Sequence, residues 1–325
     1  MPATRRAFLQ LAALSAPAAL HLPANAQVLP GRPVSIIMPF PPGGPADAAV
    51  RLLAQRLKDD LGQNVIVDYK PGAAGAIANN YTKRQPPDGT TLAIVATTYT
   101  VAPATNPTVH NYDPATDFTP IARLSGITSV FVAGDKAPFA NFPELLAHAR
   151  ANPGKVTLAT SGAGANNHLF GLQLAQAAKI DLNFIHFKGA AEETQALMGG
   201  SVDLGIQGLG AARAAAASGR ARMLAVATGR SSLVPELQPV SDFVPGLEMT
   251  SYLGLIGPPQ MPKALAGKIS GLVAAIWRSP EMLPLLRTAG QVEAWLDPAG
   301  FARYVTEDLA RQRAVVKASG QKFES

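Results

Sequence analysis

The amino-acid sequence predicts an α/β protein with two lobes, each built on a mixed, mostly parallel sheet flanked by helices. Short apolar, β-branched runs alternate with amphipathic helical segments along the chain. The alternation starts again after residue 125, and a helical tail follows it. A length of 325 residues is enough for about two domains. We therefore expect two lobes joined by two crossing strands, with right-handed crossovers within each lobe.

The first half of the chain contains three strand signals separated by two helix signals. Val34 to Met38 is a β-branched run ended by Pro39, and Pro45 suits a first helical position, where its missing N–H needs no partner. Gly62 provides a helix stop. The expected elements are a strand at 34–38, a helix at 45–62, a strand at 65–67, a helix ending at Lys83 and a strand at 91–95. This order predicts an open, mostly parallel sheet.

The second half repeats the alternation and ends in a helical region. Strands are expected at 129–132, 156–160, 183–187, 202–206 and 223–227, and helices at 143–151, 166–179, 190–199 and 209–218. An apolar, glycine-bounded segment follows at 247–257, and the apolar spacing predicts helices throughout 263–319. We expect a discontinuous first lobe of residues 27–124 and 250–325, and a second lobe of residues 125–249.

Residues 1–26 have the pattern of an export signal, with cleavage expected after Ala26. The pair Arg5-Arg6 is followed by Phe-Leu, which resembles the twin-arginine consensus, and a Sec signal is the alternative. The apolar stretch at 7–22 is short for a membrane span of about 20 residues. The chain has no cysteine, so a lipid anchor on an N-terminal cysteine is excluded. We expect an unanchored protein in the periplasm.

The composition excludes several classes of function. The absence of cysteine excludes disulfides, thiolate metal sites, iron–sulfur clusters and cysteine nucleophiles. The histidines are isolated, so we expect neither a metal site nor a cofactor. The 28 basic and 22 acidic side chains lack the concentrated stripe that nucleic-acid binding requires. Ser161, His168 and Asp203 suggest a serine hydrolase as an alternative, although the sequence around Ser161 lacks the G-x-S-x-G elbow.

Two loops connect the end of an expected strand to the start of an expected helix. The first, at 40–47, contains Gly43 and Gly44, and the second, at 160–168, contains Ser161 and two asparagines suited to cap a helix. Ligands of open α/β sheets bind outside the carboxyl ends of the strands, and a helix N-terminus attracts an anion. With one such loop in each lobe, we expect a small carboxylate to be held across a cleft by backbone N–H groups.

The glycine loops belong to a set of motifs with a known counterpart. Residues 39–47, Pro-Phe-Pro-Pro-Gly-Gly-Pro-Ala-Asp, resemble the P-F-x-x-G-G-x-x-D loop of the Bug-type substrate-binding proteins, which are receptors associated with tripartite tricarboxylate transporters. Further motifs in the family's order are found at 61–65, 70–75, 87–92, 112–118, 187–190 and 199–203. The resemblance runs through nearly all of the chain after the export signal.

This resemblance implies a type II periplasmic binding protein that closes two lobes on a small carboxylate and is not an enzyme. Its implied partners are integral membrane transporter subunits, or a sensor kinase as an alternative, and the receptor itself is expected to be a monomer. The ligand-binding residues that we expect are Phe40, Pro41, Gly43, Gly44, Asp47, Thr98, Tyr99, Ser161, Gly162, Gly164, Asn166, Asn167, His168, Gly189, Ala190 and Gln207.

Departures from the family pattern bear on the ligand. Pro45 stands where the family often has Ser or Thr, which removes one hydroxyl donor. Gln207 stands where many members carry Asp, so a ligand amino group loses a charged partner there. Thr98 and Tyr99 are expected at the far end of the ligand. Together these differences predict a neutral distal pocket and a mono- or dicarboxylate ligand rather than an amino acid.

Overall fold

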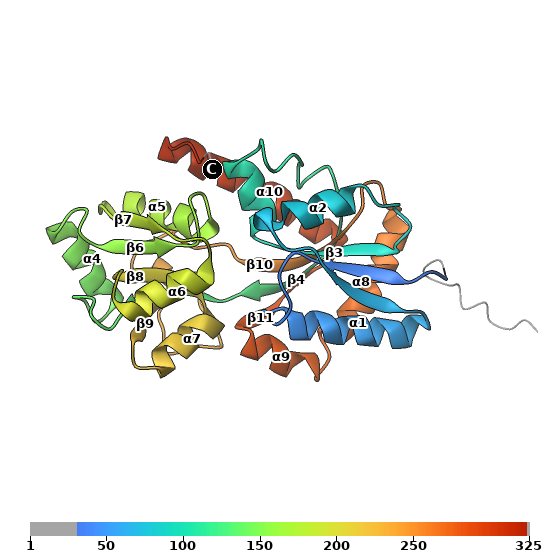
Figure 1. The fold of residues 1–325 in the computed structure, drawn as a ribbon, viewed down its shortest axis with the longest axis horizontal. Helices are drawn as coiled ribbons and strands as arrows, with labels where there is room; N and C mark the ends of the chain where they lie inside the picture. Colours follow the sequence, from blue (N-terminus) through green and yellow to red (C-terminus); the bar gives the residue numbers. More distant parts are fainter. Residues whose placement is uncertain (1–30, 324–325) are drawn as a thin grey trace, which may run out of the picture.

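A computed structural model describes residues 31–323, so the export signal expected at 1–26 lies outside the described residues. The described chain forms two α/β lobes that lie side by side (Figure 1). The first lobe contains the first and the last of the described elements, and the second contains those between them. Within residues 31–323, no helix is long and apolar enough to cross a membrane.

The first lobe is built on a mixed sheet of six strands in the order β11-β4-β10-β3-β1-β2. The strand β1 is parallel to β2 and β3, whereas β10 is antiparallel to β3 and β4. The strands are β1 (Val34–Met38), β2 (Val65–Tyr69), β3 (Thr91–Ala96), β4 (Thr119–Ile127), β10 (Tyr252–Gly257) and β11 (Gln291–Leu296). The carboxyl ends of β1 and β3 point toward the second lobe, as does the amino end of the antiparallel β10.

The second lobe is built on a mixed sheet of five strands in the order β7-β6-β8-β5-β9. The strand β6 is parallel to β7 and β8, whereas β5 is antiparallel to β8 and β9. The strands are β5 (Ser129–Gly134), β6 (Thr157–Thr160), β7 (Asn183–His186), β8 (Leu204–Gly208) and β9 (Ala221–Val226). Two mixed sheets flanked by helices confirm the predicted fold class, but the sheets are not mostly parallel, because among the described strands only the pairings of β1 and of β6 are parallel.

Helices cover both faces of each sheet. In the first lobe they are α1 (Asp47–Leu61), α2 (Ala76–Lys83), α3 (Thr98–Thr105), α8 (Lys263–Trp277), α9 (Met282–Thr288) and α10 (Pro298–Ser319). In the second lobe they are α4 (Phe142–Ala151), α5 (Asn166–Ala178), α6 (Ala190–Gly199) and α7 (Leu209–Ala217). Short 3₁₀ turns lie at η1 (Ala73–Gly75) and η2 (Val240–Asp242). One apolar core lies under α1 and α8, and an aromatic core around Tyr99, Tyr252 and Phe301 lies on the opposite face of the same sheet.

The chain crosses between the lobes twice, and a helix adds a third contact. Only Thr128 separates β4 from β5, and the return passes through Thr250 and Ser251 into β10. The helix α10 packs on α3 and β4 of the first lobe and on α5 of the second. Phe323, just beyond α10, is buried in a small cluster with Val101 of the first lobe and Leu169 of the second.

Two local expectations are wrong for physical reasons, and one helix contains an internal proline. Pro45 lies in the turn before α1, which begins at Asp47, so the proline is not the first helical residue. The strand β11 interrupts the region expected to be all helical, because it obtains its hydrogen bonds from β4 rather than from its own sequence neighbours. The helix α3 includes Pro103, and the Tyr99 carbonyl that this proline leaves unpaired accepts a hydrogen bond from Tyr112 Oη at 3.4 Å instead.

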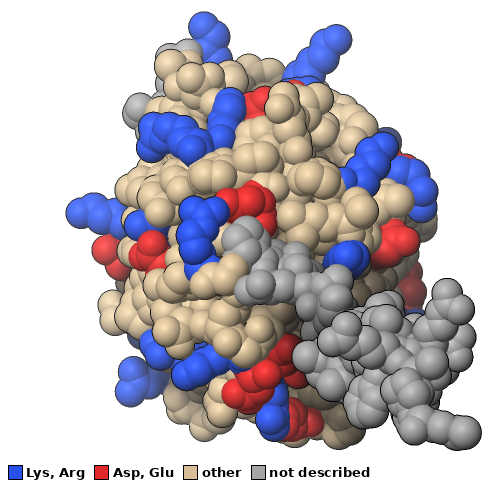
Figure 2. All heavy atoms as spheres, turned by 90° about the vertical axis from the view of Figure 1, so that its right-hand side faces the viewer, with Lys and Arg blue, Asp and Glu red and all other residues tan. Residues whose placement is uncertain are grey.

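On the end of the first lobe that Figure 2 shows, basic and acidic side chains are scattered among uncharged residues. Blue and red groups lie next to one another on this face rather than gathering by sign.

Candidate functional site

The second glycine loop joins β6 to α5 and reaches the first lobe. Gly162 and Gly164 have φ values of 129° and 74°, which glycine adopts without steric cost. A Cβ atom on Gly164 would lie 3.0 Å from Cβ of Thr105 and 3.1 Å from Cβ of Phe323. The sequence therefore places glycine at a point where the backbone of the second lobe closely approaches the first.

The two asparagines of this loop support it from inside rather than capping α5. Ala165 is the N-cap residue, without a side-chain capping bond. Asn167 Oδ1 accepts hydrogen bonds from Ser161 N at 3.3 Å and Ser161 Oγ at 3.2 Å. Asn166 Nδ2 donates to the carbonyl of Thr250 at 3.0 Å, which ties the loop to a crossing segment. The expected capping role is wrong, and both side-chain amides are engaged by protein groups.

His168 is a buried structural residue. Its Nδ1 accepts a hydrogen bond from Gly164 N at 3.0 Å, and its ring contacts those of His186 and Phe323 at centroid distances of 4.6 Å and 5.4 Å. Burial, and then the neighbouring His186, lower the pKa of His168 to about 4. The imidazole is therefore neutral near pH 7 and supports the loop instead of supplying a positive charge.

The residues suggested for a serine hydrolase are not assembled into a triad. Ser161 Oγ bonds to Asn167, and His168 bonds to the backbone of Gly164. Asp203 Oδ2 accepts from N and Oγ1 of Thr157 at 2.8 Å and 2.7 Å, at the amino end of β6. Because Ser161 follows the carboxyl end of the same strand, Asp203 lies at the wrong end to orient a catalytic histidine.

Asp47 holds the first glycine loop in place. Its Oδ2 accepts from Gly43 N and Arg51 Nε, each at 3.0 Å, and its Oδ1 accepts from Tyr69 Oη at 2.5 Å. Desolvation raises the pKa of Asp47, but the bonds from Tyr69, Gly43 and Arg51 outweigh it, so the pKa lies below its ordinary value. Asp47 is buried and negative, and it positions the loop rather than contacting a carboxylate.

A cavity of 540 Å³, which we call the interlobe cleft, lies between the lobes beside the second glycine loop. The first lobe contributes Thr98, the 73–74 backbone and α3, and the second contributes the 161–165 loop and Lys188. The complete lining is Ala73, Ala74, Thr98, Val101, Ala102, Thr105, Asn106, Val109, His110, Ser161, Gly162, Ala163, Gly164, Ala165, Lys188 and Phe323. Thr98, Ser161, Gly162 and Gly164 are thus the expected site residues that line this cleft.

The wall formed by residues 72–75 was not expected, and its backbone is strained. Gly72, Ala73, Ala74 and Gly75 all have positive φ, of 120°, 45°, 48° and 92°. Alanine pays a steric cost in this region, and such residues cluster at functional sites. A Cβ on Gly75 would lie 3.8 Å from Pro39 Cβ, which places this wall against the start of the first glycine loop.

The remaining expected residues lie around the cleft, and one of them is wrong. Tyr99 is 1% exposed in the aromatic core and donates its hydroxyl to the carbonyl of Pro114 at 2.8 Å, so its side chain cannot face a ligand. Gln207 is buried, and its Nε2 donates to Thr194 Oγ1 at 3.0 Å. Gly189 is the N-cap residue of α6 and Ala190 is its first residue, directly after Lys188 of the cleft wall. Phe40, Pro41, Gly43 and Gly44 form the partly exposed first loop, outside the lining of the cleft.

Lys188 and Phe323 are two of the cleft residues that sequence reasoning missed. Lys188 lies within the 187–190 motif, so its position beside Gly189 was the available signal. Phe323 lies beyond the last helix and carried no motif; only the packing of α10 across both lobes brings it to the cleft.

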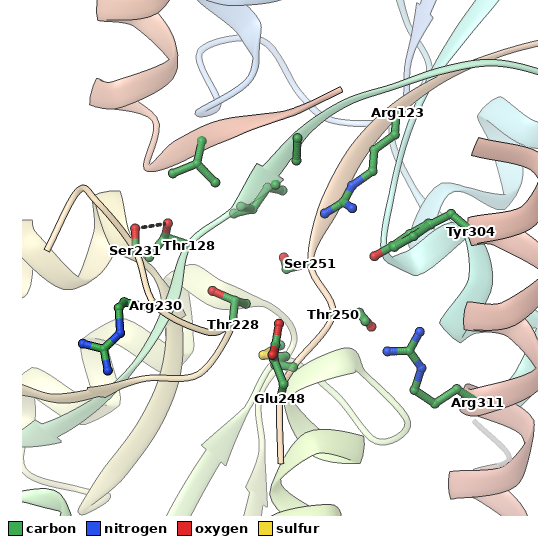
Figure 3. A pocket seen from close by; sticks show the side chains of 15 residues that line it. Arg123, Thr128, Thr228, Arg230, Ser231, Glu248, Thr250, Ser251, Tyr304 and Arg311 are labelled. Atoms are coloured by element: carbon green, nitrogen blue, oxygen red, sulfur yellow. Dashed lines mark hydrogen bonds between the residues drawn. The ribbon is translucent and has the colours of Figure 1, made fainter. Parts of the chain in front are cut away.

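A second, smaller cavity of 240 Å³, which we call the hinge cavity, lies where the chain crosses between the lobes. Figure 3 shows Arg123 and Arg311 pointing into it from one side and Glu248 from another. The Arg123 guanidinium lies 4.4 Å from the centroid of the Tyr304 ring. Because three arginines line it, namely Arg123, Arg230 and Arg311, the hinge cavity is the competing location for a carboxylate.

Two mixed sheets, two crossing segments and a cleft beside a glycine loop define the class of two-lobed solute-binding receptors. The chain belongs to the TctC family, the tripartite tricarboxylate transporter family receptor, which matches residues 49–321. The members of this family are solute receptors rather than enzymes, so the chain is a receptor. The resemblance to the Bug-type proteins is confirmed.

Known members share both sequence and fold with this chain. BugT of Bordetella pertussis is 27% identical, over 95% of this chain and 95% of BugT. A protein of R. palustris solved with adipate is 28% identical, with a TM-score of 0.79 over 90% of this chain and 98% of that one. MatC from Rhodopseudomonas palustris, solved with bound malate, is 26% identical, with a TM-score of 0.74 over 89% of this chain and 100% of MatC.

Proposed function

We propose that this protein is a periplasmic receptor that closes its lobes on a small carboxylate and delivers it to a tripartite tricarboxylate-type membrane transporter. The observation that carries the proposal is the interlobe cleft, whose two sides belong to different lobes. A ligand that contacts both sides favours the closed state, since it binds that state better than the open one. The moving bodies are the two lobes, hinged at Thr128 between β4 and β5 and at Thr250 before β10, which lie within a few residues of the expected boundaries at 124/125 and 249/250.

The ligand carboxylate is held by the backbone N–H groups of Gly162, Ala163 and the first turn of α5, because the N–H groups of Ser161, Gly164 and Ala165 already bond to Asn167, His168 and Gly162. Helix N-termini attract anions through their unpaired N–H groups and the helix dipole. Lys188 adds a mobile positive charge to the same wall. The first glycine loop, fixed by Asp47, reaches the carboxylate on closure, directly or through ordered water.

The ligand class is a mono- or dicarboxylate without an amino group. Adipate and malate, bound by the two relatives, are such molecules. A cleft of 540 Å³ falls within the range of about 300–1,000 Å³ that small-molecule sites occupy. The receptor is exported, released from its signal after Ala26, and acts as a monomer in the periplasm.

Calorimetric titration with adipate, malate and aspartate tests the proposal and the choice of cavity together. We expect a dicarboxylate to bind and aspartate not to bind. Ser161→Ala removes the hydroxyl that bonds to Asn167 in the cleft wall and weakens binding about fivefold to tenfold, as expected for the loss of one supporting hydrogen bond. Arg123→Gln, in the hinge cavity, leaves the dissociation constant unchanged. Loss of binding in Arg123→Gln with none in Ser161→Ala would place the carboxylate in the hinge cavity and contradict the proposed site.

A further inference from the structure

A buried carboxylic acid lies directly behind the second glycine loop. Glu193, in the first turn of α6, is 1% exposed. Its Oε2 accepts a hydrogen bond from Asn167 Nδ2 at 2.9 Å, and Asn167 in turn holds Ser161 N and Oγ. A chain of three side chains therefore connects the interior of the second lobe to a residue that lines the interlobe cleft.

The surroundings of Glu193 suit a neutral acid better than a carboxylate. Within the described part of the chain, Glu193 Oε1 has no hydrogen-bond partner, and neither does the buried Oε1 of Gln207. Both side chains flank Gly205: a Cβ on this glycine would lie 3.3 Å from Glu193 Oε1 and 3.7 Å from Gln207 Nε2. A protonated Glu193 supplies an O–H donor among these acceptors, whereas an ionised one adds a further acceptor.

No positive charge compensates Glu193 within residues 31–323. The titratable groups of its own segment and of the elements packed on it are His168, His186, Lys188, Glu192, Asp203 and Arg213. Lys188 and Glu192 are exposed, and Arg213 donates instead to the carbonyl of Leu233. Both histidines have lowered pKa values. Burial raises the pKa of Glu193 to about 8, and the hydrogen bond from Asn167 offsets this only in part.

We infer that Glu193 is a positioning residue of the ligand site, which in its protonated form holds Asn167 and Ser161 in the geometry that accepts a carboxylate. The inference rests on the proposed function, because it assumes that the ligand binds beside Ser161. Ionisation of Glu193 places an uncompensated negative charge behind the loop. This charge disfavours the ligand carboxylate, and by linkage the bound ligand favours the protonated acid.

The inference also changes how the specificity of the pocket is understood. Gln207 is uncharged and stands where many family members carry Asp, so the sequence predicts a pocket without an acidic side chain. The structure instead shows an acid one element away, on α6, with its side chain against the same Gly205. Because this acid is protonated near neutral pH, the pocket keeps the neutral character that a carboxylate ligand requires, and it loses that character in alkaline solution.

Binding of adipate and malate at pH 7 and pH 9 tests the inference, since these values lie on either side of the pKa of about 8. For the wild type we expect an affinity about fivefold lower at pH 9, a typical size for coupled sites. Glu193→Gln preserves the neutral shape, and we expect it to bind as tightly as the wild type at pH 7 and to lose the pH dependence. Glu192→Gln, the exposed neighbour, keeps the wild-type profile. The inference is overturned if the wild type binds equally tightly at pH 7 and pH 9, or if the affinity of Glu193→Gln depends on pH as strongly as that of the wild type.

A measurement without ligand separates this inference from the proposed function. Nitrogen-15 NMR of the free protein should show the Ser161 amide and the Asn167 side-chain amide titrating with a midpoint near pH 8, and not titrating in Glu193→Gln. If neither carboxylate binds but these resonances titrate, the proposed ligand class is wrong and the positioning contact stands. If they do not titrate between pH 7 and pH 9, Glu193 does not control the loop.

Discussion

Asp47→Asn tests whether one carboxylate holds the first glycine loop. The wild-type side chain accepts three hydrogen bonds, from Gly43, Arg51 and Tyr69. Asparagine has the same shape, but it carries no charge and has one acceptor oxygen, so its amide nitrogen faces a donor on the other side. The variant therefore removes the charge from all three bonds and breaks at least one of them.

The expected magnitude follows from the burial of the partners. A hydrogen bond to a charged group contributes about 1.5–3 kcal/mol, and exposed partners contribute less because water replaces the protein group. Asp47 is 7% exposed, whereas Gly43 and Arg51 are exposed, so the bond from Tyr69 accounts for most of the effect. We expect a loss of about 2 kcal/mol at pH 7, which lowers Tm by about 4–8 °C.

Thermal unfolding at pH 7 and at pH 3 is the assay, with Asp59→Asn, an exposed aspartate of the same helix, as the matched control. The pKa of Asp47 is lowered from 3.8 by folding, so its stabilisation is complete above that value and is lost as the pH falls through the lower folded pKa. The difference from the wild type should therefore shrink in acid. An Asp47→Asn protein as stable as Asp59→Asn at pH 7 would refute the reasoning, as would a deficit that stays constant in acid.

Three further variants have defined outcomes. The Tm of Glu193→Gln relative to the wild type should rise as the pH increases from 4.5 to about 8, because the folded wild type retains a proton in this range that the unfolded chain releases. A Tm difference that is constant over this range contradicts the prediction. Ala74→Gly relieves a φ of 48° and should stabilise the protein by about 1 kcal/mol in urea unfolding, so a loss of stability would be unexpected. Gly164→Ala should lower the free energy of unfolding more than Gly219→Ala, because both glycines have positive φ but only a Cβ at 164 meets the opposite lobe. Equal losses of stability in the two variants would show that this contact is unimportant.

Local signals predicted much of the fold, and long-range pairing explains most of what they missed. The strand–helix alternation placed α6 at 190–199, and the Gly62 stop marked the end of α1, because both are specified by residues within one segment. The edge strand β11 was missed because its hydrogen bonds come from β4, which is more than 160 residues away in the sequence. A short, half-buried edge strand has no strong pattern of its own.

The candidate site was predictable where conformation requires glycine and unpredictable where partners are distant. Gly162 and Gly164 could be singled out because their positive φ excludes most other residues. Tyr99 follows a strand and could equally face a ligand or the core, and only the packing of Tyr112 and Phe118 against its ring decides for the core. The role of Glu193 depends on Asn167, which lies 26 residues earlier on another helix.

The central claim is that a carboxylate binds at the second glycine loop, and the most direct measurement is a nitrogen-15 NMR titration of the wild type with adipate. The account predicts that the largest changes occur at the backbone amides of Gly162 and Ala163, with Gly43 and Gly44 following as the lobes close. Changes centred on Arg123 and Thr250 around the hinge cavity, with the glycine loops unaffected, would contradict it.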